Sequence, residues 1–289
     1  MRYQLFLGCT IPARQNNYER SARKVSEALG LELLGTDFGC CGFPVEPIDE
    51  VKALSMAAVN LKKASEVGEP VVSLCSACGE MLNKAERLLE DEDTSKRVNA
   101  ILGKSLNLSY EGEKPVILHF ARMLHQEYGL DRIREKVKNP LKIKVATHPG
   151  CHYVRPKELF GEFDDPEYPR SLDELVEATG AEAVDYVGKT DCCGGSLLAV
   201  NEGVSKAMTR KKLNTLKGKV DALVLVCPFC GIMYDKYQKT LEEEAGTQYN
   251  VPVLYYPQLL GLALGIDPGE LGFDVNSVSV KQLLEKVIQ

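Results

Sequence analysis

Ten cysteines are the residues of this sequence whose type and spacing could do chemistry. They form two groups of five, and each group has a single cysteine, then a vicinal pair, then a C-x-x-C motif. Thiolate sulfur binds zinc and iron–sulfur clusters, and paired thiols can also form or exchange disulfides. The positions are Cys9, Cys40, Cys41, Cys75 and Cys78, then Cys151, Cys192, Cys193, Cys227 and Cys230.

The spacing of the two groups indicates an internal duplication. Cys41 and Cys75 are separated by 33 residues, and Cys193 and Cys227 are separated by the same number. Residues between Tyr18 and Glu32 recur 150 positions later, and Gly42, Met56, Gly79 and Met81 recur 152 positions later. A period this long is typical of two similar domains and not of a solenoid. We therefore predict domains at residues 1–140 and 141–289, with the boundary near Asn139-Pro140.

Several kinds of site use cysteine, and they differ in how many thiols they need. A structural zinc ion takes four thiolates, and disulfides are disfavoured by five thiols per group and by a reducing compartment. A thiol–disulfide oxidoreductase would use only the C-x-x-C motifs. An iron–sulfur cluster accounts for the thiols most economically, because an opened or enlarged cluster could use all five. The residues favour one such cluster per domain, with a zinc-stabilised scaffold as an alternative.

The pattern of apolar residues predicts an α/β fold in which each of two similar domains has a mainly parallel sheet flanked by helices. The expected strands are 3–7, 31–34, 71–74, 115–118, 142–147, 183–186, 222–226 and 251–255. The expected helices are 18–29, 49–66, 79–89, 94–102, 171–179, 201–216 and 232–244. Cys9, Cys75, Cys151 and Cys227 then follow the carboxyl ends of strands, the edge where parallel sheets bind ligands.

Composition and charge exclude several classes of protein. The chain is 44% apolar and 26% charged, which is typical of globular and not of disordered proteins. A net charge of −6 gives no general attraction to nucleic acid or to anionic lipid. No apolar run approaches the roughly 20 residues that span a bilayer, and the N-terminal segment has no apolar signal core. We expect a cytoplasmic protein without direct membrane insertion or nucleic-acid binding.

The two cysteine motifs resemble those of a known family. Cys9-x30-Cys40-Cys41-Gly42-x32-Cys75-x2-Cys78 and Cys151-x40-Cys192-Cys193-Gly194-x32-Cys227-x2-Cys230 are similar to the two CCG motifs in the B subunit of the coenzyme B–coenzyme M (CoB–CoM) heterodisulfide reductase. The resemblance to this cysteine-rich CCG-domain family covers nearly the whole chain, including the ending 261–268.

The resemblance implies a catalytic subunit that reduces the CoM–CoB heterodisulfide to two thiols. It implies two non-cubane 4Fe–4S clusters, one in the N-terminal CCG domain and one in the C-terminal CCG domain. The five cysteines of each group would bind one cluster, and the disulfide would lie between the two clusters. Since splitting an S–S bond takes two electrons and gives two sulfur anions, a metal site on each side could stabilise both products.

Other residues are candidates for proton transfer and for binding the anionic substrate. His152, next to Cys151, is the candidate proton donor, a role that the resemblance also implies. Arg14 and Arg155 occupy roughly equivalent loops and are expected to contact the sulfonate or phosphate ends of the substrate. Arg122 and Lys212 are weaker candidates, and Lys212 is expected on a solvated helix face. We expect His148 to cap or pack, and His119 and His125 to be structural or solvated.

The sequence contains no ferredoxin-type cysteine run, no G-x-G-x-x-G and no flavin motif, so a partner must supply electrons. The resemblance implies that the partners are the iron–sulfur C subunit and, through it, the flavin-containing A subunit of the heterodisulfide reductase complex. An alternative is a CCG-domain electron-transfer subunit of a quinone-, succinate/fumarate- or 2-hydroxy-acid-linked oxidoreductase.

Overall fold

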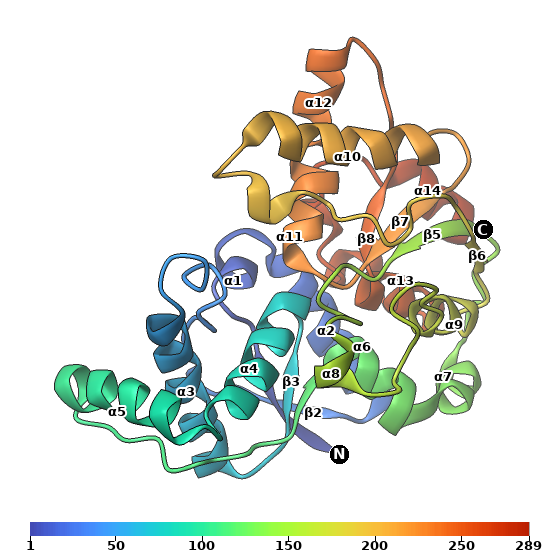
Figure 1. Ribbon diagram of the computed structural model, residues 1–289. Coiled ribbons are helices and arrows are strands. Elements are labelled where there is room, and N and C mark those ends of the chain that lie inside the picture. The colour runs from blue at the N-terminus through green and yellow to red at the C-terminus, as the bar shows by residue number, and fades with distance from the viewer. Residues whose placement is uncertain (289) are drawn as a thin grey trace.

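Two parallel sheets, one from each half of the sequence, form the framework of the computed structural model, which describes residues 1–288 (Figure 1). The first sheet has the strand order β2-β1-β3-β4 and the second has the order β6-β5-β7-β8. The α/β prediction is therefore confirmed. The strands are β1 (Arg2–Phe6), β2 (Glu32–Leu34), β3 (Val71–Ser73), β4 (Ile117–His119), β5 (Lys144–His148), β6 (Glu182–Val184), β7 (Ala222–Leu225) and β8 (Val253–Tyr255).

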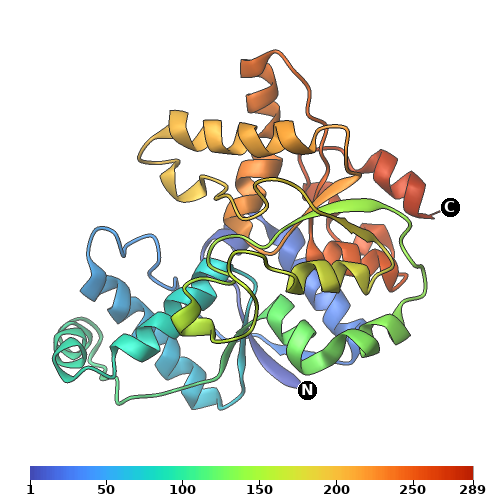
Figure 2. The ribbon, with the colours of Figure 1, turned by 45° about the vertical axis from the view of Figure 1, so that its right-hand side comes forward.

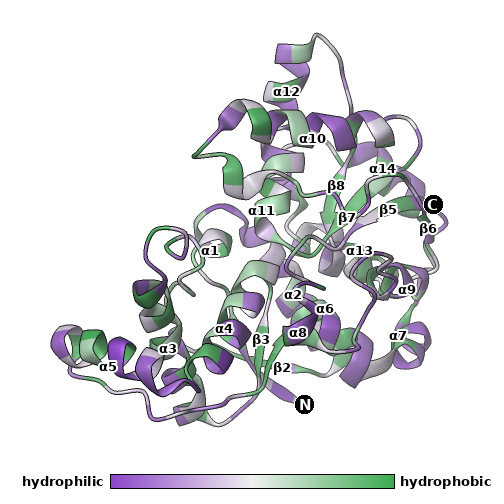
Figure 3. Cartoon of the chain, in the orientation of Figure 1, coloured by the Kyte–Doolittle hydropathy of each residue, from purple (hydrophilic) through white to green (hydrophobic). Residues whose placement is uncertain are grey.

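The central strands of both sheets are buried on both faces. All residues of β3 and β7 are buried, as expected for parallel strands that helices cover on each side. In Figure 3 β3 is green, while α5 and α10 alternate green and purple along their length. The two halves also share their register: β1 pairs with β3 through Gln4 and Val71, and β5 pairs with β7 through the equivalent residues Ala146 and Leu223. The sheets are therefore matched frameworks for the loops at their edges.

Helices connect the strands and begin at recognisable caps. Asp49, Asp91 and Asn201 each accept a hydrogen bond from the backbone N–H three residues later, which fixes the start of a long helix. The helices are α1 (Thr10–Arg14), α2 (Asn16–Leu29), α3 (Glu50–Val67), α4 (Ser76–Leu88), α5 (Glu92–Leu106), α6 (Phe120–Met123), η1 (Leu124–Gly129), α7 (Leu130–Lys136), α8 (Lys157–Phe160), α9 (Ser171–Glu177), η2 (Gly195–Leu197), α10 (Glu202–Leu216), α11 (Pro228–Gly231), η3 (Ile232–Lys236), α12 (Gln238–Ala245), α13 (Tyr256–Ala263), η4 (Pro268–Glu270), η5 (Phe273–Val275) and α14 (Lys281–Ile288).

The last helical segment of each sheet crosses to the other half. Helix α13, which follows β8, packs against α2, and the α6–η1 segment, which follows β4, packs against α9 (Figure 1, Figure 2). At the first contact the rings of Tyr18 and Tyr255 stack with centroids 4.0 Å apart. At the second, Nε2 of His125 in η1 lies 2.7 Å from Oε2 of Glu174 in α9. The two halves are thus joined by a reciprocal exchange of helices.

The predicted elements agree with the structure except where the chain is uniformly apolar or forms short helices. Each predicted strand overlaps an observed one, but the helical segments at 120–136, 256–263 and 281–288 were not predicted. The expectation that Lys212 lies on a solvated face is wrong, because this side chain is buried on α10. Among residues 1–288 no helix has the length and apolarity that crossing a membrane requires.

Candidate iron–sulfur centres

Four of the ten cysteines lie in matched places just after the carboxyl ends of strands, and two more lie in the helices that follow. Strands β1 and β3 run directly into the loops of Cys9 and Cys75, and β5 and β7 run into those of Cys151 and Cys227. Cys78 and Cys230 then lie one turn into the helices that follow, α4 and α11. The prediction that the thiols gather at this edge of each sheet is confirmed.

The vicinal cysteines lie on tight turns that a glycine makes possible. Gly42 and Gly194 have φ of +95° and +86°, and a Cβ on either would lie within 2.7 Å of a backbone carbonyl oxygen of α3 or α10. The turns also point backbone N–H groups at sulfur: Gly194 donates to Cys192 and Gly195 donates to Cys193, both at 3.3 Å. Such N–H groups stabilise thiolate, the form of cysteine that binds metals.

In the first half the five thiols form a continuous series of contacts. The Sγ atoms of Cys9 and Cys40 are 3.9 Å apart. Cys40 interacts in turn with Cys41, Cys41 with Cys78, and Cys78 with Cys75. Cys9 is exposed, whereas Cys41, Cys75 and Cys78 are buried, so the series runs from the surface into the interior.

The second half repeats this series and meets the first. Cys151 interacts with Cys192, Cys192 with Cys193, Cys193 with Cys230, and Cys230 with Cys227. The series then crosses between the halves, because the thiols of Cys227 and Cys75 interact with each other. All ten sulfur atoms therefore form one series with its midpoint at the interface between the halves.

Hydrogen bonds between these thiols set which of them ionise first. The bond from Cys40 lowers the pKa of Cys41 to about 4, and the bond from Cys151 lowers the pKa of Cys192 to about 2. Cys230 likewise holds the pKa of Cys227 well below its usual range. Each half thus has at least one thiol that is ready to bind a metal as thiolate. Within residues 1–288, no three His, Cys, Asp or Glu side chains are grouped so as to hold a single metal ion.

Hydrogen-bond donors without acceptors lie beside the thiols of the second half. Nε2 of His148 and the hydroxyl groups of Tyr234 and Tyr255 are buried and have no hydrogen-bond partner among the described residues. The charges of second-half thiols act on all three groups. Because the sulfur atoms of a cluster accept hydrogen bonds, an iron–sulfur cluster would satisfy such donors. The residues present therefore fit a sulfur-rich cofactor.

A small cavity at the interface combines both halves. First-half cysteines line it together with Phe43, and Pro228 and Phe229 of the second half close it. The Phe43 ring contacts His152 edge-on at 4.9 Å and lies 6.4 Å from the ring of Phe229. The first group of thiols therefore faces an apolar space that the second half closes, and the imidazole of the candidate proton donor contacts Phe43 at its wall.

Glu80, which the sequence analysis missed, faces His152 across the interface. Oε2 of Glu80 lies 3.6 Å from Nδ1 of His152, and the Glu80 side chain is only 7% exposed. Burial raises the pKa of Glu80 to about 7 and lowers that of His152. The signal that could have indicated Glu80 is its place two residues after the first C-x-x-C motif, where the second half has Ile232.

The two candidate arginines lie in different surroundings. Arg14 is exposed at the last residue of α1, beside the first group of cysteines. Arg155 is partly buried, and its Nε and Nη2 donate to the carbonyl oxygen of Pro166 at 3.1 and 2.6 Å. Arg14 is therefore free to meet an anion from solvent, whereas Arg155 already holds its own loop.

The other positively charged candidates are buried. Arg122 stacks between Phe160 and Phe163, with its guanidinium carbon 4.2 and 4.1 Å from the ring centroids, and donates to the Tyr153 carbonyl oxygen at 2.8 Å. Nζ of Lys212 donates to Nδ1 of His148 at 2.8 Å. Burial lowers the pKa of His148 to about 3 and that of Lys212 to about 8. His148 is therefore neutral and accepts the bond.

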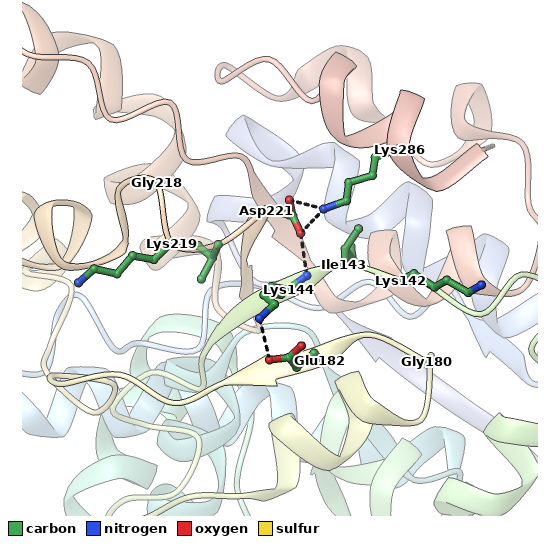
Figure 4. Close-up of a pocket in the computed structure, with 10 residues that line it drawn as sticks. Lys142, Ile143, Lys144, Gly180, Glu182, Gly218, Lys219, Asp221 and Lys286 are labelled. Carbon is green, nitrogen blue, oxygen red and sulfur yellow. Dashed lines mark hydrogen bonds and ion pairs between the residues drawn. The ribbon is translucent and has the colours of Figure 1, made fainter.

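A second cavity, of about 460 Å³, lies at the opposite edge of the second sheet (Figure 4). Two of its lysines are paired: Lys144 with Glu182 at 3.4 Å, and Lys286 with Asp221 at 2.9 Å. Figure 4 shows Lys219 pointing outward, away from these pairs. Because this cavity lies at the amino-terminal ends of β5, β6 and β7, it is separate from the cysteine site.

Comparison with known proteins agrees with the repeated cysteine geometry. The cysteine-rich domain family CCG matches residues 3–83 and again residues 145–235. The chain belongs to the CCG family. This CCG protein is 34% identical, over its whole length and 97% of the relative, to the B subunit of the ferredoxin:CoB-CoM heterodisulfide reductase of Methanosarcina mazei. It is also 32% identical, over 97% of its length and 98% of the relative, to the 8-methylmenaquinol:fumarate reductase membrane anchor subunit of Wolinella succinogenes.

The fold of this CCG protein also matches a solved structure. A hypothetical protein from Helicobacter pylori superposes with a TM-score of 0.75 at 17% identity and covers 96% of the CCG protein. The CCG protein spans 52% of the length of that solved chain. At this identity the match establishes the two-sheet α/β fold. The names of the sequence relatives establish that the chain belongs with heterodisulfide reductase B subunits and related oxidoreductase subunits.

Proposed function

We propose that this protein is the catalytic subunit that reduces the CoM–CoB heterodisulfide to two thiols. The observation that supports this most directly is the series of ten thiols, five from each half, which meets at Cys75 and Cys227. A disulfide has two sulfur atoms that become thiolates, so two thiol-rich sites that meet at the interface between the halves suit the symmetry of the reaction.

Each half would bind one non-cubane 4Fe–4S cluster through its five cysteines. The first ligand set is Cys9, Cys40, Cys41, Cys75 and Cys78, and the second is Cys151, Cys192, Cys193, Cys227 and Cys230. Bound clusters would supply single electrons, two of which are needed to split one disulfide. On this proposal residues 1–140 and 141–289 are two CCG domains with one cluster each.

The side chains around the cavity would exclude water and deliver a proton. Phe43 and Phe229 cover the space between the halves. His152 lies against Phe43, and Oε2 of Glu80 lies 3.6 Å from its Nδ1, so Glu80 would have to move within hydrogen-bond distance to replace a proton lost from His152. Arg14 would contact an anionic end of the substrate from solvent, and Arg155 would do so after releasing the Pro166 carbonyl.

Electrons would come from partner proteins, since the relatives are named as subunits of larger reductases. We propose that the iron–sulfur C subunit is the direct donor and that the flavin-containing A subunit supplies it in turn. A second candidate function is electron transfer between a quinol and fumarate, because the relative from Wolinella succinogenes is nearly as similar as the heterodisulfide reductase relative.

Metal analysis and turnover of anaerobically purified protein test these proposals. We expect about eight iron and eight acid-labile sulfide per chain, and reduction of the CoM–CoB disulfide by a reduced viologen dye. Zinc without sulfide would contradict the cluster proposal. A full complement of iron and sulfide without disulfide turnover, together with electron transfer from a naphthoquinol, would favour the second candidate function, electron transfer between a quinol and fumarate.

Substitution of one cysteine in each vicinal pair separates the roles of the two sites. We expect Cys41→Ala and Cys193→Ala each to lose about half of the iron and to abolish heterodisulfide reduction, because one site alone cannot take both sulfur atoms. Ser196→Ala, an exposed change in the turn after the second pair, is the control and should keep both properties. Wild-type turnover in either cysteine variant would refute a role for that site.

A further inference from the structure

Lys212 and Asn60 occupy the same place in the two halves but differ in charge. They are 152 positions apart, as are the C-x-x-C motifs, and lie in the middle of α10 and α3. Each holds the loop that leads to a vicinal cysteine pair. Asn60 accepts from the Gly39 N–H at 2.8 Å and donates to the Cys40 carbonyl oxygen at 3.0 Å. The second half therefore has a cation where the first half has a neutral amide.

The side chain of Lys212 is placed to remain a buried ammonium group. Nζ donates to the carbonyl oxygens of Lys189 at 2.9 Å and Asp191 at 3.1 Å, and to Nδ1 of His148 at 2.8 Å. These three acceptors match the three N–H bonds of an ammonium group. The residue is 4% exposed, and Nζ lies 5.6 Å from the Tyr186 ring centroid. The geometry thus fixes a positive charge inside the protein.

This positive charge acts on the second group of thiols. Cys230, Cys193 and Cys151 all interact electrostatically with Lys212. Asp191 also acts on Lys212, but its carboxylate is paired at 2.8 Å with Lys211, whose side chain is 72% exposed. The charge of Lys212 is therefore only partly compensated, and it acts on the sulfur atoms as well.

In the first half, the cation that reaches the equivalent loop is Lys63, one helical turn after Asn60, and its side chain is partly exposed. There Lys63 donates to the backbone carbonyl of Asp37 and lies 3.7 Å from the carboxylate of the same residue. Its side chain is 39% exposed, so solvent and a counter-charge both screen it. The two thiol groups therefore differ in the buried charge that they experience.

We propose that Lys212 makes the second-half cluster more easily reduced than the first-half cluster, so that the two sites have distinct reduction potentials. The inference rests on the proposed function for the presence of both clusters. Each reduction adds one electron from the reductant and one negative charge to a cluster. A fixed cation stabilises the reduced form, and more strongly in the protein interior than in water.

A redox titration of the full-length, cluster-containing protein tests the proposal. Dithionite is added anaerobically while electron paramagnetic resonance follows the two clusters. We expect two separate reduction steps in the wild type. Lys212→Asn places in the second half the residue that the first half has at this position. It should shift the reduction step of higher potential to a more negative potential, so that the two steps lie closer together. Asn60→Lys should instead shift the lower step to more positive potential.

Two further variants distinguish charge from loop packing. Lys211→Asn removes the same charge from the neighbouring exposed position and should leave both steps unchanged. Lys212→Arg keeps the charge and should retain the wild-type separation. Unchanged steps in Lys212→Asn with full iron content would overturn the inference but leave the proposed function standing. If Lys212→Asn loses iron, its reduction steps cannot be compared with those of the wild type, and the Asn60→Lys variant becomes the test. An unchanged potential of the lower step in Asn60→Lys would then overturn the inference. Wild-type protein without iron would overturn both proposals.

Discussion

His119 belongs to the first half of the chain but hydrogen-bonds to a loop of the second half. At the end of β4, its Nδ1 accepts from the Ala121 N–H at 3.1 Å, and its Nε2 donates to the carbonyl oxygen of Val226 at 2.9 Å, directly before Cys227. Both bonds require the neutral imidazole with its proton on Nε2, because a proton on Nδ1 would face the Ala121 N–H. Burial accordingly lowers the pKa of His119 to about 4.

This arrangement predicts acid destabilisation of the cluster-free protein. An unfolded histidine titrates near pH 6.5, so the stability that neutral His119 provides is present above that pH and is lost as the pH falls toward 4. The loss is about 1.4 kcal/mol per pH unit. In His119→Asn, urea unfolding between pH 6.5 and 4.5 should show a slope that is shallower by this amount. Parallel slopes for variant and wild type would contradict the prediction.

His152 supports a prediction about turnover. If it donates a proton to a product thiol, His152→Ala should lower the rate about 100-fold while both clusters remain. His125→Ala is the matched control, because that imidazole pairs with Glu174 at 2.7 Å on another face of the protein. The measurements are the turnover rate and the iron content of each variant. An unchanged rate and pH profile in His152→Ala would remove His152 from the mechanism.

Turns that pack against long helices position the vicinal cysteines. At Gly42 a Cβ would lie 2.4 Å from the carbonyl oxygen of Ala53, whereas at Gly68, which also has a positive φ, a Cβ would have no atom within 4 Å. Gly68→Ala should therefore cost about 1 kcal/mol for the left-handed backbone alone. Gly42→Ala should cost about 1–3 kcal/mol more through overpacking, and it should displace Cys41. Equal unfolding free energies for the two variants would refute this account of the turn.

Sequence periodicity could predict two kinds of element: helices with one buried face, and strands that contain a short run of β-branched residues. Helix α13 was not predicted because all of its residues, Tyr256–Ala263, are buried, so no polar face marks its period. The burial of Lys212 and of Glu80 also could not be predicted, since charged side chains are usually exposed and only the packing of distant segments covers these two. The cysteine positions were predictable because a parallel sheet fixes where its strands end.

At the scale of the whole molecule, the repeat in sequence does not imply equal environments. Tyr18 and Tyr168 correspond in the duplication, yet Tyr18 is buried against Tyr255 while Tyr168 is 77% exposed. The difference arises because α13 covers α2, whereas the shorter α9 is covered by α6 and η1 and leaves residue 168 outside. The sequence alone cannot reveal which member of such a pair the other half will cover.

The exchange of helices predicts that the halves unfold together. Tyr18→Ala should cost about 3–5 kcal/mol, because it removes a large buried ring from the contact between α2 and α13. Calorimetry of the cluster-free variant should show one transition at lower temperature, and not two. Tyr168→Ala, the matched control, should change the free energy of unfolding by less than about 0.5 kcal/mol. A split transition, with only one part shifted, would show that the halves are independent.

The crossing of α13 onto α2 has a consequence for biosynthesis. Helix α2 leaves the ribosome early, but the segment that covers its apolar side, Tyr256–Ala263, is translated near the end of the chain. During translation, the apolar side of α2 in the nascent first half therefore stays exposed until α13 is made. Exposed apolar surfaces of this kind are prone to aggregate or to bind chaperones. On the proposal that each half binds a cluster, iron delivery would be best timed after translation is complete, when the cysteines of both halves are in place.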